Sequence, residues 1–503
     1  MYGGGCFMRN KRLAYNTISA VAYQIISIIC GFILPRLILV HYGSGVNGLV
    51  NSITHFLQVI TFLDLGVGAV IQSALYKPLA ENDNKQISEI ISAAIKFFKK
   101  IAIALVIYIV FLCIFYPNYV AKDYSDLFSV LLILAIGISI FSENYIGVVD
   151  RILLSADQRG YVHYTVRIIT IIVNTGLCAL LINLNVSIQV VKFTTSIIFL
   201  FRPLFIRMYV NKKYSINRRE YYNEEPIKQK WNGVAQHVSA VVLDQTDIIV
   251  LTTFSTLANV SIYSVYHLVV YGVKNVLWAA TNGIQSLLGE IIAKDEKENL
   301  KRVFRGCEWT LHTASTYFFS CTAILIIPFV ELYTYGVTDI EYIQPLFAVL
   351  ITSAHAIHCL RLPYNILILA AGHYKQTQSN YIISALINII VSILAVEKFG
   401  LIGVAIGTIC AMLYQTIWMA YYDAKNILKI SMSNFFKQLL VDLCVVMCSV
   451  GATSFIKMGQ VSVVSFLIMT IEILVISLII TFCINWMFYK ERVKVLWENL
   501  FRS

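Results

Sequence analysis

The sequence predicts an all-α polytopic membrane protein with about fourteen transmembrane helices. Of its 503 residues, 58% are hydrophobic and only 13% are charged, whereas about 25% of the residues of a soluble protein are charged. Hydrophobic runs of about 20 residues recur along nearly the whole chain, and this length crosses about 30 Å of hydrocarbon. Helices are expected because each spanning segment must pair its own backbone N–H and C=O groups.

The positions of the hydrophobic runs predict each span in turn. The fourteen spans are expected at residues 16–40, 48–75, 97–117, 127–149, 161–184, 187–208, 233–256, 260–289, 309–332, 342–371, 377–397, 400–422, 436–457 and 461–489.

The placement of basic residues predicts the orientation of the spans. Most of the 39 Lys and Arg residues lie at the termini and the even-numbered loops, and only four lie near the odd-numbered loops: Lys122, Lys192, Lys398 and Lys457. Basic loops stay in the cytoplasm, so both termini are expected inside and the number of spans is even. The net charge of +11 then reflects topology and contact with anionic membrane lipids, not binding to nucleic acid.

One long polar break divides the chain. It predicts an N-terminal lobe at residues 1–208 (spans 1–6), a cytoplasmic linker at 209–232, a C-terminal lobe at 233–424 (spans 7–12), and spans 13 and 14 with a cytoplasmic tail at 425–503.

An internal repeat relates the two lobes. The sequence Ile-Gln-Ser-Ala-Leu at 71–75 returns as Ile-Gln-Ser-Leu-Leu at 284–288, and Asn174 returns as Asn388 at nearly the same offset. Because six spans is an even number, both copies enter the membrane from one side as parallel repeats. Two such lobes predict a transporter that binds its substrate between them and works by alternating access.

Cofactor chemistry has little support in the sequence. The eleven cysteines are scattered, mostly through apolar runs, and no Cys-x-x-Cys motif occurs, so neither disulfides nor a metal site is expected. The sequence has no phosphate-binding motif of the P-loop type. We expect no cofactor other than a coupling H⁺ or Na⁺, and no enzymatic activity.

Several short motifs carry a family resemblance. They are Tyr-Asn-Thr at 15–17, Leu-Pro-Arg-Leu at 34–37, Tyr-Gly at 42–43 and Phe-Leu-Asp-Leu-Gly at 62–66. With the layout of six, six and two spans, the chain resembles the polysaccharide transporters of the multidrug/oligosaccharidyl-lipid/polysaccharide exporter superfamily. The resemblance implies a flippase in the bacterial cytoplasmic (inner) membrane. Such a flippase translocates undecaprenyl-diphosphate-linked repeat units for lipopolysaccharide O-antigen, capsule or exopolysaccharide assembly, alongside the polymerase and glycosyltransferases of that pathway.

A polar and aromatic stripe in the eighth span is the main candidate for substrate binding. His267, Tyr271, Lys274 and Trp278 are three or four residues apart, so they share one helix face. A diphosphate head group needs a cation, and aromatic rings suit sugars. An ionisable residue inside a membrane is a functional candidate by default, although Lys274 could instead pair with a carboxylate that holds helices together.

Three acidic residues are candidates for ion coupling or gating. Asp244 and Asp247 lie three residues apart in the seventh span, where they could carry H⁺ or Na⁺ or neutralise Lys274. Asp64, in the second span, could close a gate, take part in coupling, or satisfy local polar contacts.

Two arginines are further candidates for binding the diphosphate. Arg36 follows Pro35 near the outer end of the first span, and Arg361 lies in the inner half of the tenth. The planar guanidinium group suits phosphate, but either side chain could simply reach the lipid head groups.

Two other functions stay open at this point. A membrane polymerase or ligase of the same glycan pathway would need a sizeable external loop, which this chain lacks. An ion-coupled multidrug antiporter would favour an acidic cavity for cations, and Lys274 fits that poorly.

Overall fold

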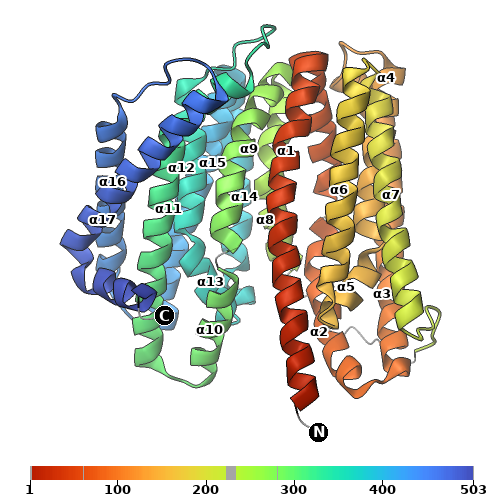
Figure 1. Ribbon diagram of the computed structural model, residues 1–503, viewed down its shortest axis with the longest axis horizontal. Helices are drawn as coiled ribbons and strands as arrows, with labels where there is room; N and C mark the ends of the chain where they lie inside the picture. Colours follow the sequence, from red (N-terminus) through yellow and green to blue (C-terminus); the bar gives the residue numbers. More distant parts are fainter. Residues whose placement is uncertain (1–2, 61, 223–233, 280, 502–503) are drawn as a thin grey trace. The chain divides into compact units, whose positions relative to one another are not determined.

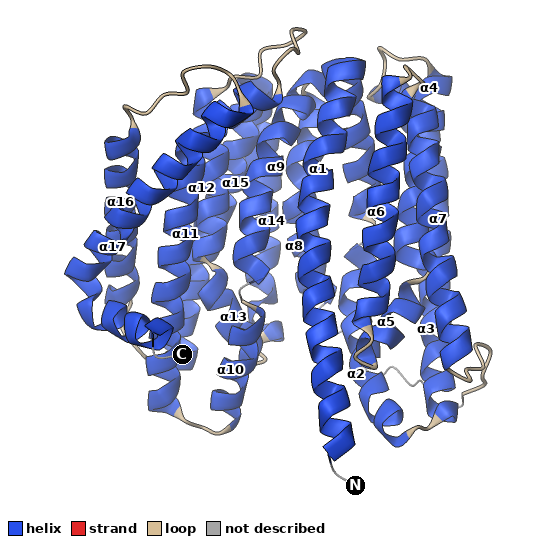
Figure 2. Ribbon diagram, viewed as in Figure 1, coloured by secondary structure: helices blue, strands red, loops and turns tan. Residues whose placement is uncertain are grey.

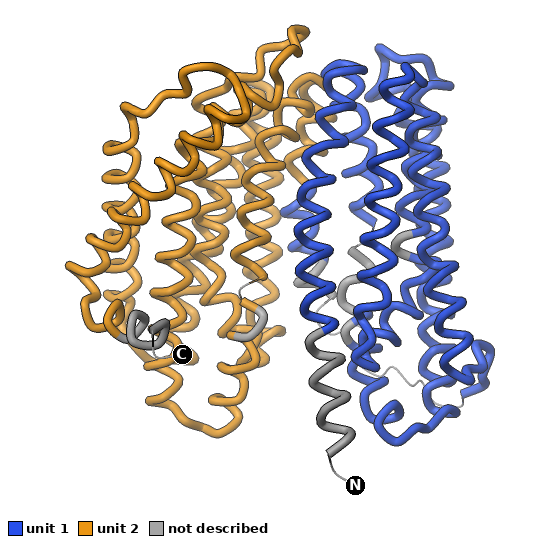
Figure 3. Tube along the Cα trace, viewed as in Figure 1, with its two compact units in different colours: residues 1–245 blue, residues 246–503 orange. Residues whose placement is uncertain are grey.

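The computed structural model describes residues 3–60, 62–222, 234–279 and 281–501. Within these ranges the chain forms helices joined by short turns and contains no β-strand (Figures 1 and 2). The predicted all-α class is confirmed. The chain divides into two compact units, Met1–Gln245 and Thr246–Ser503 (Figure 3).

Unit 1 follows the predicted order of spans. Its elements are α1 (Gly3–Val59), α2 (Phe62–Glu81), α3 (Asn84–Tyr119), α4 (Asp126–Phe141), the π-helical turn η1 (Ser142–Ile146), α5 (Val148–Ala156), α6 (Gly160–Asn183) and α7 (Ile188–Lys213). Gly43, at φ 81° and ψ 174°, breaks α1 between the first two predicted spans. Helix α1 ends at Val59 and α2 begins at Phe62, so two helices share the second predicted span. The sequence did not predict this break because hydropathy does not detect it.

Unit 2 holds most of the remaining elements. The chain enters it along α8 (Val234–Phe254). Next come α9 (Leu257–Ala279), α10 (Asn282–Ala293), α11 (Lys297–Tyr333), α12 (Pro345–Leu360), α13 (Leu362–Ala370), α14 (Tyr374–Phe399), α15 (Leu401–Tyr422), the π-helical turn η2 (Asp423–Leu428), α16 (Ser433–Thr453) and α17 (Val463–Phe501).

The helices have the length and composition of membrane spans. Among the described residues, ten helical segments are long and apolar enough to cross a bilayer, and α4 is a shorter apolar helix. The chain is therefore a multi-pass membrane protein. Each of the fourteen predicted spans overlaps helix among the described residues, and those outside the ten segments fall mainly on α2, on α4 with α5, on α8, and on α9 with α10. The total of fourteen and the orientation stay predictions.

The internal repeat is visible in the order and position of helices. Helix α3 begins at residue 84 after a left-handed Asn82, and α11 begins at 297 after a left-handed Asp295. Likewise α6 begins at 160 after a left-handed Gln158, and α14 begins at 374 after Gly372. Because left-handed residues end helices, the two copies share both their helices and the residues that terminate them.

Many helices bury small polar residues and expose large apolar ones. Helix α14 buries Ser384, Asn388 and Ser392, while Leu386 and Leu394 are exposed. This arrangement is typical of helices surrounded by lipid, where small residues allow close approach and polar groups pair between helices.

Helices α14 and α15 approach each other closely. The turn between these helices is Gly400, at φ +52°. A Cβ on Gly403 would lie 2.5 Å from the Ala395 carbonyl oxygen, and a Cβ on Gly407 would lie 2.1 Å from the Ser392 Oγ. The two glycines, four residues apart, form the small-residue motif that lets membrane helices touch backbone to backbone.

Part of the predicted linker packs onto unit 1. The Arg218 guanidinium lies 2.8 Å from the Asp150 carboxylate of α5, and the Asn217 backbone N–H donates to Ser88 Oγ on α3. Residues 223–233 of the linker lie outside the described residues.

Candidate functional site

The predicted polar and aromatic stripe lies on α9, and some of its side chains are buried while others are exposed. Lys274 is only 2% exposed, while Tyr271 and Trp278 are 42% and 47% exposed. The Lys274 ammonium lies 5.0 Å from the centroid of the Tyr271 ring, and His267 stacks on Tyr271 at 5.2 Å. Lys274, Tyr271 and His267 therefore form one cation–aromatic group, with Trp278 one turn farther along α9.

Helix α12 brings two further histidines to this group. The ring of His355 meets that of His267 edge to face at 5.5 Å. Both His355 and His358 lie within range of the Lys274 charge. Arg361, at the junction of α12 and α13, is buried and lies 3.3 Å from His358 Nδ1. Thus Arg361 and Lys274, separated by 87 positions in the sequence, belong to one buried basic region of unit 2.

Asp247 of α8 is a buried carboxylate with several hydrogen-bond partners. It is 5% exposed. Thr408 Oγ1 lies 2.8 Å from both of its oxygens, Tyr263 Oη donates to it at 2.9 Å, and the Asn388 amide lies 3.4 Å away. Helices α9, α14 and α15 supply these three groups, and the glycine contact between α14 and α15 brings Asn388 and Thr408 together.

The repeat reproduces part of this arrangement in unit 1. Asn174 and Thr195 occupy the positions of Asn388 and Thr408, and both contact Cys178 Sγ at 3.4 Å. No acidic residue lies at the position equivalent to Asp247, because residues 33 and 34 are Ile and Leu. The amide and hydroxyl pair is thus shared by the two units, and the carboxylate belongs to unit 2.

The remaining predicted residues lie elsewhere. Asp244 is exposed and lies in unit 1, where its neighbour Gln245 is hydrogen-bonded to His55 on α1 at 2.5 Å. Arg36 is half-buried on the first part of α1. Asp64 falls within α2, but its side chain lies outside the described residues.

A second polar cluster in unit 2 was missed by the sequence analysis. His312 Nδ1 of α11 lies 2.7 Å from the Asp442 carboxylate of α16, and Tyr364 Oη of α13 donates to Glu308 at 2.7 Å. Asp423 lies nearby at the start of η2. Glu308 and Asp423 each lie one residue outside a predicted span, so the rule for intramembrane ionisable residues did not apply to them. His312 and Asp442 lie inside spans, and the rule for intramembrane ionisable residues would have found them.

A basic cavity of about 960 Å³ lies at the beginning of α11. Four of its lining residues are cationic: Lys301, Arg302, Arg305 and Arg492. The Arg492 guanidinium donates to the Arg305 carbonyl at 2.9 Å, and Lys301 pairs with Glu298 at 2.6 Å.

The Tyr-Asn-Thr motif at 15–17 has a structural role in unit 1. The Asn16 amide donates to the Gln158 carbonyl at 2.9 Å, and its oxygen accepts from the Tyr161 N–H at 2.8 Å. Asn16 thereby ties α1 to the turn before α6 and satisfies one of the first N–H groups of α6.

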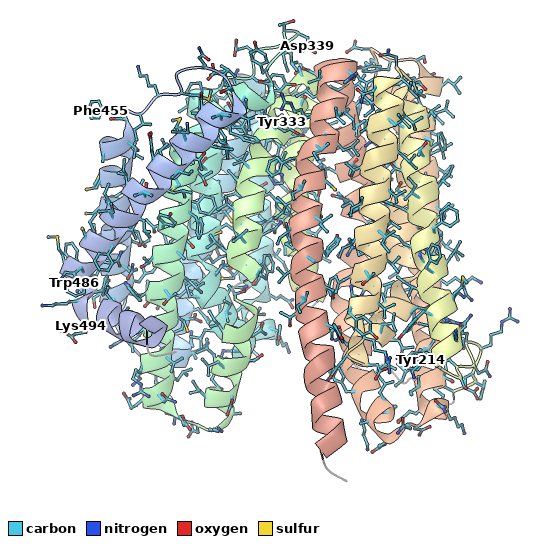
Figure 4. The ribbon with its side chains drawn as sticks, viewed as in Figure 1. Tyr214, Tyr333, Asp339, Phe455, Trp486 and Lys494 are labelled. Atoms are coloured by element: carbon cyan, nitrogen blue, oxygen red, sulfur yellow. The ribbon has the colours of Figure 1, made fainter. Side chains whose placement is uncertain are left out.

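The same turn is linked to the residue after α7. Asp157 accepts hydrogen bonds from Arg159, at 2.6 Å, and from Tyr214 (labelled in Figure 4). Burial and the bond to Asp157 raise the pKa of the Tyr214 hydroxyl above its usual range. Burial alone would lower the pKa of Arg159, but its bonds to Asp157 and Tyr209 raise it.

Comparisons with known proteins identify solved structures of similar fold. No family model and no curated protein sequence matches the chain. Among solved structures, the lipid II flippase MurJ in its inward closed conformation is similar, with 16% identity and a TM-score of 0.72 over 95% of this chain and 99% of that one. The eukaryotic MATE transporter AtDTX14 has 10% identity and a TM-score of 0.58, covering 87% and 98%. The Vibrio cholerae MATE transporter VcmN in its bent form has 12% identity and a TM-score of 0.53, covering 84% and 98%.

At these identities the likeness is one of fold. The chain therefore has the fold shared by the lipid II flippase and the MATE transporters.

Proposed function

We propose that the protein is a flippase that moves undecaprenyl-diphosphate-linked oligosaccharide repeat units across the bacterial cytoplasmic membrane for cell-surface polysaccharide assembly. The observation that carries the proposal is the extent of the structural match. The lipid II flippase matches 95% of the chain, whereas the two MATE transporters AtDTX14 and VcmN match 87% and 84%. The lipid II flippase is thus a better template for the whole chain than these MATE transporters.

The chemistry of α9 and α12 supports an anionic head group as cargo. Lys274 and Arg361 are buried cations, and His267 and Tyr271 offer aromatic faces beside Lys274. A diphosphate is bound by charge-assisted hydrogen bonds, and the aromatic rings give sugars a flat apolar surface. A cationic drug would be repelled by the same two charges.

We propose in addition that Asp247 takes part in ion coupling. Its carboxylate has oxygen neighbours in Thr408 and Tyr263 and accepts from Asn388 Nδ2, whose own Oδ1 has no hydrogen-bond partner among the described residues. Carboxylate, hydroxyl and amide oxygens can bind Na⁺, and protonation of the carboxylate would serve H⁺ coupling equally. The absence of an equivalent acid in unit 1 makes the coupling asymmetric.

The decisive experiment locates the lipid-linked sugar by leaflet. The gene is deleted, and undecaprenyl-linked oligosaccharide is assayed on each face of the membrane, with complementation by the wild-type gene as the control. We expect intact repeat units to accumulate on the inner face. Units that reach the outer face but are not polymerised would point to a polymerase or ligase. Unchanged pools together with greater drug sensitivity would favour a multidrug antiporter.

A further inference from the structure

The second polar cluster of unit 2 consists of five side chains from four elements that are distant in the sequence. They are Glu308 and His312 on α11, Tyr364 on α13, Asp423 in η2 and Asp442 on α16, and each is buried. The His312 Nδ1 and Asp442 Oδ2 atoms are 2.7 Å apart, and Gln438 also donates to Asp442 at 3.1 Å. Asp442 is therefore paired with His312.

Asp423 is the exception within the cluster. Asp423 is 1% exposed, and neither of its carboxyl oxygens has a hydrogen-bond partner among the described residues. Together with Glu308 and Tyr364 it lines a cavity of about 10 Å³, which is room for about one water molecule. Asp423 also begins a π-helical turn, and such turns occur frequently at functional sites.

No ion pair of the Asp423 carboxylate is found among the described residues. Within its range lie the Glu308 carboxylate and the hydroxyls of Tyr364, Tyr381 and Tyr422. Of the nearby basic groups, His312 is bonded to Asp442, Arg361 contacts His358, and Arg492 donates to the Arg305 carbonyl on α11. An ionised carboxylate without donors or a partner is strongly disfavoured when buried.

The two carboxyl groups beside the cavity differ in whether a hydrogen-bond donor reaches them. Glu308 accepts a hydrogen bond from Tyr364 Oη at 2.7 Å, so one of its carboxyl oxygens has a donor. Asp423 has no such donor. Two carboxylates that share one buried site do not ionise together, so the group without a donor takes the proton.

We propose that Glu308 and Asp423 form a proton-binding site in unit 2, with the bound proton on Asp423. The proton comes from water and returns to water when the cavity opens, so the carboxyl group gains one O–H bond on binding and loses it on release. This site is separate from the Lys274 group and from Asp247. The proposal holds for any cargo, because no residue of the cluster belongs to the predicted substrate site.

The test is infrared spectroscopy of the full-length protein in lipid nanodiscs, where a protonated carboxyl group gives a carbonyl band distinct from that of carboxylates. We expect a protonated-carboxyl band at neutral pH that loses the area of one group in Asp423→Asn. The matched control is Asp295→Asn, whose carboxylate is exposed in the turn before α11, and its band should equal that of the wild type. An identical band in wild type and Asp423→Asn would overturn the proposal.

A second variant keeps the test decisive if Asp423→Asn does not fold. Glu308→Gln removes the second carboxyl group of the shared buried site, so the band should disappear at a lower pH than in the wild type. An unchanged titration would count against a shared site. Titration with Na⁺ at constant pH provides the third measurement: the band should persist, and its loss on adding Na⁺ would mean that the site binds a metal cation instead.

Discussion

At the scale of single residues, Lys274 is the side chain on which the proposed function depends most. Lys274→Ala removes a buried cation that the fold has already desolvated, so we expect translocation of lipid-linked sugar to be lost while membrane insertion stays normal. The measurement is export of the glycan in cells that carry only the variant. Lys294→Ala, which alters an exposed lysine paired with Glu290, serves as the control. Wild-type export by Lys274→Ala would remove Lys274 from the site.

Thr408 tests the network around Asp247. Thr408→Val keeps the shape of the side chain but removes the hydroxyl that contacts both Asp247 oxygens. The free energy of unfolding should fall by about 1–3 kcal/mol, because a buried carboxylate loses a donor. Thermal unfolding in detergent measures this. Thr253→Val is the control, since its exposed hydroxyl bonds only to the Ile249 carbonyl of its own helix. Equal stability of the two variants would contradict the assigned contact.

At the scale of elements, the contact between α14 and α15 holds Asn388 and Thr408 in place. Gly407→Ala would put a methyl group 2.1 Å from Ser392 Oγ and 3.0 Å from the Asn388 carbonyl. Separating the helices should lower the free energy of unfolding by about 1–3 kcal/mol. A Cβ on Gly451 of α16 meets nothing within 4 Å, so Gly451→Ala should be neutral or slightly stabilising. The two unfolding temperatures give the comparison, and unfolding at the same temperature would mean that the close approach is not maintained.

The link between the turn before α6 and the residue after α7 should be sensitive to high pH. Tyr214 donates to Asp157 only when protonated, and its folded-state pKa is raised by burial and by that bond. Its contribution is therefore complete below the unfolded pKa of about 10 and is lost as the pH rises above it. Unfolding measured from neutral to alkaline pH should show the wild type losing stability faster than Tyr214→Phe.

The Tyr214 hydroxyl can also be tested at neutral pH and against a control tyrosine. At neutral pH Tyr214→Phe should cost about 1.5–3 kcal/mol, the range for hydrogen bonds to charged groups. Tyr221→Phe changes an exposed ring and should leave the pH profile unchanged. Parallel profiles for wild type and Tyr214→Phe would show that the hydroxyl is not bonded to Asp157.

At the scale of the whole molecule, the orientation predicted from the basic loops can be measured directly. Reporter fusions at Asn217 and Asp295 should report the cytoplasm, and fusions at Asp123, Asp339 (labelled in Figure 4) and Gly459 should report the outside. The reason is the excess of Lys and Arg near the first two positions. A fusion that reports the opposite side at any of these positions would mean that the number of spans, or the orientation of that unit, differs from the prediction.

The membrane class, the helical elements and the internal repeat were determined by the sequence. Each is a local property: a run of about 20 apolar residues is a helix in lipid wherever it occurs, and a repeated segment folds into a repeated helix. The break in α1 at Gly43 and the interruption before α2 were not expected, since hydropathy averages over them.

The partners of the buried polar groups were decided only by the tertiary structure. Asp247 meets Asn388 and Thr408, which lie 141 and 161 residues farther along the chain, and His312 meets Asp442 at a separation of 130. Spacing along one helix says which residues share a face, but it does not say which helix packs against that face or at what rotation. That rotation buries Asp247 while Asp244, three residues earlier on the same helix, is exposed.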